Sequence, residues 1–305
     1  MPDTPPTLSV ANLVLRSKQQ EIDALRHLAH KAEWVDVIGQ LVQRLQRERG
    51  ASCIYLASQT QRFAEVRHQA VNEALLHEEK LRQVFSAQMD PAQGTSAQTL
   101  SLMAWALLGL ESLPALRLQI DRQAMSALDA VAAYSHLIAG LVELVFHMAD
   151  TAGVPSVSRL LVALLHAVQA TEEACQESAM GALLYASGHF QEAHQQRRLH
   201  WIDAQERSLR VFGDFAEPAL RARWDELQLA PCMAQLERLR RALCVARPGT
   251  ALDSDLSHTW FGACSERMDG LWQLRGVLVR RLYTSEAADD TSCVDWEGGR
   301  IHKIK

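Results

Sequence analysis

Helical periodicity without strand-like alternation most strongly limits what this chain can fold into. Apolar residues recur every three or four positions through segments of several helical turns, which is typical of amphipathic helices. Most segments are joined by short connections rich in Pro, Gly, Asp and Ser, such as 90–96 and 150–156. We therefore predict an all-α fold of two antiparallel, up-and-down four-helix bundles. Helices this long do not suit a repeat solenoid.

Turn residues divide the chain into a tail, a helical body and a second tail. Residues 1–24 contain a Pro-rich tail and a lead-in helix, and residues 25–285 form the helical body. Residues 286–305 have little periodicity, so we expect them to be a loose tail. Pro114 predicts a helix boundary and Gly140 a further interruption. Helical patterning starts near Ser9, and the helices expected after it span 33–56, 62–85, 100–110, 115–149, 156–187, 190–215, 218–229, 231–247 and 253–283.

Charge and cysteine content indicate an ordinary cytoplasmic protein. The formal net charge of -5 argues against direct nucleic-acid binding by the chain as a whole. Its six cysteines contain no CxxC pair, so we expect buried thiols in a reducing compartment instead of a zinc ribbon or a disulfide framework. The N-terminus has no signal-peptide pattern, and polar residues interrupt the apolar stretches before about 18 residues, so we expect no membrane span.

An arginine continues the inward face of the helix predicted at 33–56. Arg49 follows Leu45 by four residues and Val42 by seven, so it points towards the core. A guanidinium stays charged and is rarely buried alone. Arg49 therefore needs either an anion from outside or a structural ion pair with a glutamate, such as Glu48 of a neighbouring helix or a bundle-facing glutamate elsewhere.

Small and polar residues replace leucine along the helix predicted at 156–187. Its inward stripe passes from Leu164 and Val168 through Cys175 to Ser178. Small side chains let either a second helix or a small ligand approach closely. Tight helix packing and a ligand site both remain open for this stretch.

A second arginine cluster lies in the segment 237–241. Arg240 is near an inward apolar stripe, and Arg238 flanks it. A solvated basic face is the simplest interpretation. Arg49 and Arg240, however, have no equally inward acidic partner that the pattern reveals, and an anion between them would relieve their repulsion. The two segments together favour an anion site.

No catalytic or metal-binding constellation stands out. Glu65-x-x-His68 occurs once, whereas di-iron bundles use this motif twice, so a solvated helix face explains it better. His27 and His30 have no identifiable third ligand. The chain contains no Walker A loop, no Rossmann glycine motif and no nucleophile elbow. We predict that it is not an enzyme and uses no metal or cofactor.

Taken in order, these segments resemble the nitrate- and nitrite-sensing domain of bacterial signalling proteins, the NIT domain. The resemblance covers about 25–285 and is closest to the sensor part of nitrate-responsive antitermination regulators. The motifs that carry it are Leu45-Gln-Arg-Glu-Arg-Gly-Ala-Ser52 with Tyr55, the segments 158–164 and 176–190, and, more weakly, 205–207 and Trp260-Phe261 with 267–269.

The resemblance implies two antiparallel four-helix bundles with nitrate or nitrite bound between them by arginines. Matched by motif, Arg49 is the first expected ligand, and either Arg238 or Arg240 is the second. A guanidinium suits a planar oxyanion because two parallel N–H groups match two oxygens.

Two features depart from the family pattern. Gln176-Glu-Ser178 stands where family members often carry Gln-Glu-Arg, so Ser178 replaces a cation expected near the site. In the antiterminators an RNA-binding ANTAR module follows the sensor, and no such module is recognisable in 286–305.

We therefore expect a nitrate- or nitrite-binding sensor that regulates nitrogen assimilation, in which the anion shifts the packing of two bundles. Its partners would be the small anion and either a separate output protein or a second copy of the chain. The alternative is a ligand-free, sensor-like scaffold that acts through a partner protein, which Ser178 and the unrecognised effector module favour.

Overall fold

Helices and short loops make up the part of the chain that the computed structural model describes, which is residues 9–59, 61–90, 95–149, 155–190 and 192–292. A β-bridge joins His189 to Ala251, and the all-α prediction is confirmed. The α-helices are α1 (Val10–Ser58), α2 (Ala64–Ala87), α3 (Ala97–Asp121), α4 (Ala127–Ala149), α5 (Pro155–Ser187), α6 (Glu192–Phe215), α7 (Pro218–Gln228), α8 (Pro231–Val245) and α9 (Leu256–Ser292).

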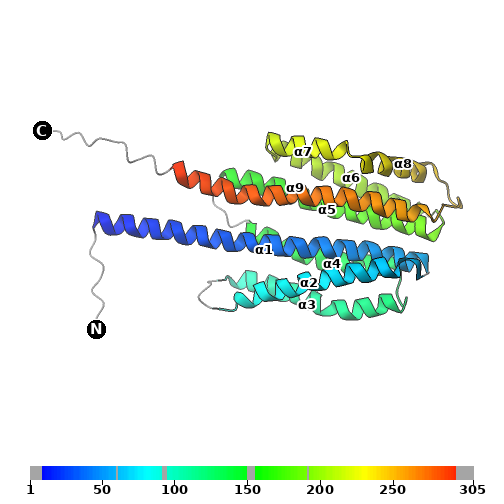
Figure 1. Cartoon of the computed structure of the whole chain (residues 1–305), viewed down its shortest axis with the longest axis horizontal. Helices are drawn as coiled ribbons and strands as arrows, with labels where there is room; N and C mark the ends of the chain where they lie inside the picture. The colour runs from blue at the N-terminus through cyan, green and yellow to red at the C-terminus, as the bar shows by residue number, and fades with distance from the viewer. Residues whose placement is uncertain (1–8, 60, 91–94, 150–154, 191, 293–305) are drawn as a thin grey trace.

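The helices form two bundles that lie side by side along their length (Figure 1). Helices α1 to α4 form the N-terminal bundle, in which α4 packs against α1 and α3. In the C-terminal bundle α5 packs against α6 and α9, while α7 and α8 follow one another along one side and pack against α9. Helix α1 contacts both α5 and α9, so the contact between the bundles runs mainly through α1.

The first helix is longer than predicted. Ser9 caps it, because its Oγ accepts a hydrogen bond from the backbone N–H of Asn12 at 3.1 Å. The helix then continues to Ser58, so the predicted lead-in helix and the helix 33–56 are one element. Its first turns, with Val10 and Leu15 exposed, extend beyond the bundles in Figure 1.

Both predicted interruptions in the N-terminal half are wrong. Helix α3 continues through the exposed Pro114, because burial of Leu110 and Leu113 on its other face outweighs the lost backbone hydrogen bond. Helix α4 passes through Gly140 without a break. The turn that separates α3 from α4 lies between these two positions, at Gln123, whose φ of 50° is left-handed.

The C-terminal helix also extends further than predicted. Helix α9 reaches Ser292, so the first part of the predicted loose tail 286–305 is helical. The remainder, 293–305, lies outside the described residues, as does most of the predicted turn 150–156.

Helices α3 and α4 are long and apolar enough to cross a membrane by length and composition alone. The apolar character of α4 has a local explanation, because α4 packs against α1 and α3 and buries Tyr134, Ile138 and Leu141. Helix α3, in contrast, carries apolar side chains on its outer face, where Trp105 and Leu108 are exposed.

Helices α5 and α9 approach each other closely at Gly181. A Cβ atom added to Gly181 would lie 2.0 Å from Cζ2 of Trp260, which is fully buried. The indole N–H of Trp260 also donates to the backbone carbonyl of Ser178 at 2.8 Å. The small residues at this end of α5 therefore serve helix packing.

This close contact predicts opposite effects for two glycine substitutions. Gly181→Ala should destabilise the protein by about 1 to 3 kcal/mol, because the Trp260 ring has to move. Gly140→Ala, where an added Cβ meets nothing within 4 Å, should be neutral or stabilising by up to about 1 kcal/mol. Urea unfolding of the two variants measures the difference, and equal stability would contradict the close packing of α5 on α9.

Candidate functional site

Helix α5 is the central helix of the molecule. Helices α1, α4, α6 and α9 all contact it, so its residues 171–185 are buried except for the half-buried Glu172. Glu173 and Glu177 lie in this interior, although neither belongs to the predicted inward stripe. The prediction of that stripe assumed that the helix has a single buried face, whereas α5 is covered on nearly all sides.

Arg49 of α1 meets Glu172 of α5 where the two bundles touch. Its Nη1 donates to Oε1 of Glu172 at 2.6 Å and its Nη2 to Oε2 at 3.2 Å. Burial alone lowers the pKa of Arg49, but the charge and hydrogen bond of Glu172 outweigh burial and raise the pKa overall. Arg49 is inward and charged as predicted, and its carboxylate partner comes from the other bundle.

Two glutamines and a serine complete this group, which we call the Arg49 cluster. Gln46 Nε2 donates to Oε2 of Glu172 at 2.7 Å, and Gln176 Nε2 donates to Oε1 at 2.8 Å. Ser135 Oγ of α4 accepts from Arg49 Nη1 at 2.7 Å and from Gln176 Nε2 at 2.6 Å. The cluster therefore ties α1 and α4 of one bundle to α5 of the other.

Glu48, next to Arg49 in sequence, faces into the N-terminal bundle. Its carboxylate accepts from Arg117 Nε at 2.7 Å and Nη2 at 2.8 Å, and from the Tyr134 hydroxyl at 2.5 Å. Arg117 also donates to Glu78. Glu48 lies on the same helix as Arg49 and is not its partner, so that predicted pairing is wrong.

The second arginine group converges on Glu177, and we call it the Glu177 cluster. Arg240 Nε donates to Oε1 of Glu177 at 2.7 Å, Gln205 Nε2 donates to Oε2 at 2.9 Å, and Arg267 Nη1 reaches Oε2 at 3.4 Å. Arg198 approaches Oε1 at 3.8 Å. Burial raises the pKa of Glu177, but hydrogen bonding and charge from Arg240 outweigh burial and lower the pKa below its usual range.

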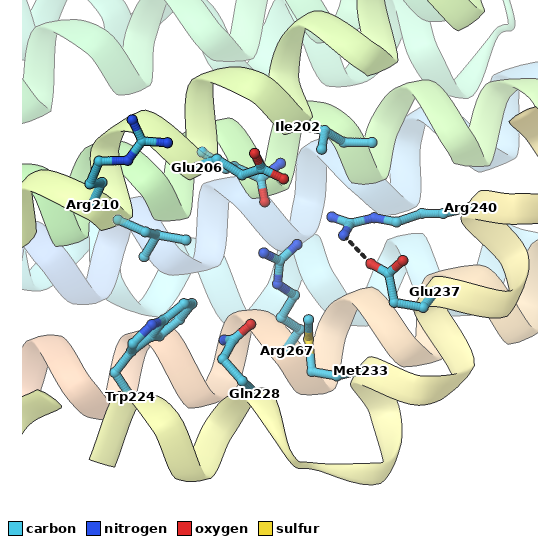
Figure 2. A pocket seen from close by; sticks show the side chains of 11 residues that line it. Ile202, Glu206, Arg210, Trp224, Gln228, Met233, Glu237, Arg240 and Arg267 are labelled. Carbon is cyan, nitrogen blue, oxygen red and sulfur yellow. Dashed lines mark hydrogen bonds and ion pairs between the residues drawn. The ribbon is translucent and has the colours of Figure 1, made fainter. Parts of the chain in front are cut away.

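A cavity of about 430 Å³ opens beside the Glu177 cluster, between α6, α7, α8 and α9 (Figure 2). The guanidinium groups of Arg240 and Arg267 point towards its middle, and Glu206 of α6 lies on the opposite side. The Arg267 side chain is only 8% exposed, and its Nε has no hydrogen-bond partner among the described residues. Burial and then the neighbouring Arg240 lower the pKa of Arg267.

Each cluster has a buried thiol beside it. Cys175 of α5 lies beside Arg49 and interacts with Cys264 of α9, which in turn lies beside Ser178 and Glu177. Burial raises the pKa of Cys264 to about 12, so its thiol stays protonated. Four cysteines are buried as predicted, Cys244 is exposed, and Cys293 lies outside the described residues; the buried ones are Cys53, Cys175, Cys232 and Cys264.

The four predicted site residues have different surroundings. Arg49 and Arg240 both form ion pairs with α5, but Arg49 pairs with Glu172 and Arg240 with Glu177. Arg238 is exposed, so the structure distinguishes it from the inward Arg240. Ser178 is buried against α9. The assumption that inward arginines have no inward acidic partner is wrong.

The Glu177 cluster predicts a pH-dependent contribution to stability. Glu177→Gln should destabilise the protein by about 3 to 5 kcal/mol at pH 7, because buried guanidinium groups lose their carboxylate. The folded-state pKa of Glu177 is lowered, so the contribution is complete above the unfolded pKa of about 4.3 and is lost as the pH falls.

Urea unfolding of wild type and Glu177→Gln at several pH values tests this, and the difference in free energy of unfolding should narrow below about pH 4. Glu237→Gln is the matched control. It removes a half-exposed partner of Arg240 and should cost less than about 1 kcal/mol. If the difference in free energy of unfolding between wild type and Glu177→Gln did not depend on pH, the lowered pKa of Glu177 would be contradicted.

Comparison with known proteins places these features in a family. The family model for nitrate and nitrite sensing, NIT, matches residues 40–282. A nitrate regulatory protein of Klebsiella oxytoca is 33% identical over 275 residues, and the match covers 89% of this chain and 66% of that protein, just under two thirds of its length. A solved structure of the NasR transcription antiterminator is similar with a TM-score of 0.79 at 26% identity, covering 94% of this chain and 77% of that one. These similarities are to regulatory proteins and not to enzymes.

Proposed function

The chain belongs to the NIT family of nitrate- and nitrite-sensing proteins, and we propose that arginines at the contact between its bundles bind the anion. Arg49 is the ligand at this contact, and Arg240, which pairs with Glu177 at the cavity between α6, α7, α8 and α9, is a second ligand at a separate position. In this proposal the chain is the sensor of a cytoplasmic system that regulates nitrogen assimilation. The relative from Klebsiella oxytoca and the NasR antiterminator, named as regulators, support this role.

The observation that carries the proposal is the burial of a charged Arg49 at the contact between the bundles. Its guanidinium is 1% exposed and already donates two N–H groups to the two oxygens of one carboxylate. Nitrate and nitrite likewise present two oxygens in one plane, so the same donors fit them. An anion bound there contacts both bundles, because Arg49 belongs to α1 and Gln176 to α5.

Arg240 offers the second cation from the other side of α5. It is inward and half-buried, and it lies beside Arg267 at a cavity with room for an ion. Because α5 carries both Glu172 and Glu177, it holds one arginine on each side. An anion that binds either arginine therefore competes with a glutamate of α5 and changes how α5 is held.

A ligand-free scaffold is the second candidate function, and one observation favours it. Both arginines already have carboxylate partners within the chain, and the position of Ser178 lacks the arginine that family members often carry. Such a protein would act by binding a partner protein whatever the nitrate concentration.

Titration calorimetry with sodium nitrate and sodium nitrite, with sodium chloride as the reference salt, tests the proposal. Wild type should bind at least one of the two anions. Arg49→Lys keeps the charge but loses the paired N–H donors, so its affinity should fall by about tenfold or more. The affinity of Arg240→Lys for the anion should also be lower than that of wild type.

Arg238→Ala is the matched control, because Arg238 is exposed and lies two residues from Arg240. It should bind as wild type does, and circular dichroism should show that all the variants are folded. Absence of nitrate and nitrite binding by folded wild type would refute the sensor proposal and favour the scaffold.

A further inference from the structure

We infer that Glu172 is an internal competitor of the anion: its carboxylate fills the anion position at Arg49 in the free protein, and nitrate or nitrite enters by displacing it. The inference rests on the proposed function and assigns to Glu172 control over affinity and over the contact between the bundles.

The Arg49 cluster is shaped around a planar group with two oxygens. Four N–H donors point at the Glu172 carboxylate, two on each oxygen: Arg49 Nη1 at 2.6 Å and Gln176 Nε2 at 2.8 Å on Oε1, and Arg49 Nη2 at 3.2 Å and Gln46 Nε2 at 2.7 Å on Oε2. A carboxylate and a nitrite ion share this arrangement of two oxygens on one atom. The donors therefore do not need to move when one group replaces the other.

Exposure shows which member of the cluster can leave. The Glu172 side chain is 23% exposed, whereas Arg49 is 1% exposed. Gln46 and Gln176 are also buried. The glutamate can therefore turn towards solvent and regain hydration, while the donors stay in place.

Displacement keeps the electrostatic balance of the site. One negative charge leaves Arg49 and another arrives, so the buried guanidinium is never left without an anion. The exchange therefore avoids the cost of an uncompensated buried charge. The measured affinity for nitrate or nitrite then reflects how much more strongly Arg49 binds the free anion than it binds Glu172.

The exchange changes what connects the bundles. Glu172 is covalently part of α5, so its bonds to Arg49 and Gln46 tie α5 to α1. A free anion satisfies the same donors without that covalent tie. Anion binding thus loosens one link between the bundles, which supplies the differential affinity that a two-state sensor needs.

Glu172→Gln tests the inference through a gain of affinity. The amide keeps the size of the side chain but removes the competing charge, so nitrate and nitrite should bind at least about tenfold more tightly than to wild type, in keeping with a charge-assisted contact. Glu173→Gln is the matched control. Glu173 is the adjacent buried glutamate, it accepts a hydrogen bond from Ser208 at 2.8 Å on another face of α5, and its substitution should leave anion affinity unchanged.

The outcomes separate this inference from the proposed function. If wild type binds nitrate and Glu172→Gln binds equally or more weakly, Glu172 is only a structural partner and the inference fails while the sensor proposal stands. If neither protein binds either anion, both fail. Binding by Glu172→Gln alone would also overturn both, because the anion would then fail to displace the wild-type carboxylate.

Calorimetry is paired with a thermal melt, so that a folding defect is detected. If Glu172→Gln does not fold, Glu172→Asp replaces it, since the shorter side chain withdraws the carboxylate from Gln46 and Arg49 but keeps its charge. Tighter anion binding by Glu172→Asp is then the expected result, and unchanged binding would overturn the inference.

Discussion

The pairing of buried arginines with the glutamates of α5 is the interaction on which the rest of the structure depends. Removing one partner of such a pair leaves an uncompensated charge that costs several kcal/mol. Helix α5 must therefore lie where Glu172 reaches Arg49 of α1 and Glu177 reaches Arg240 of α8. This requirement places α5 between α1 and the remaining helices of its own bundle, and it fixes where the two bundles meet.

Much of the fold follows from local pattern. The 3.6-residue periodicity predicted the all-α class, the start of the first helix near Ser9 and the inward direction of Arg49. Pro114 shows where local rules fail, because its effect on α3 is decided by the burial of Leu110 and Leu113. Helix propensity is a weak prior that tertiary packing overrides.

The acidic half of the candidate site could not be found by the same rules. A one-face helical pattern assigns Glu172 and Glu177 to the solvent side, whereas α5 is covered on nearly every side. Which carboxylate meets which arginine also depends on contacts between residues far apart in sequence, such as Arg49 and Glu172. The signal in the sequence that could have revealed a central helix is the occurrence of small residues, such as Gly181, on several faces of a helix that also carries glutamates.

Neighbouring residues of α1 face different bundles, and this determines how a change at Arg49 would spread. Glu48 is fixed inside the N-terminal bundle by Arg117 and Tyr134, while Arg49 reaches across to Glu172 of the other bundle. Because the Glu48 contacts do not include the anion position that we propose at Arg49, they would hold α1 in its own bundle if the Arg49 contacts changed. A change of partner at Arg49 would therefore shift the N-terminal bundle as a unit relative to α5 instead of unwinding α1.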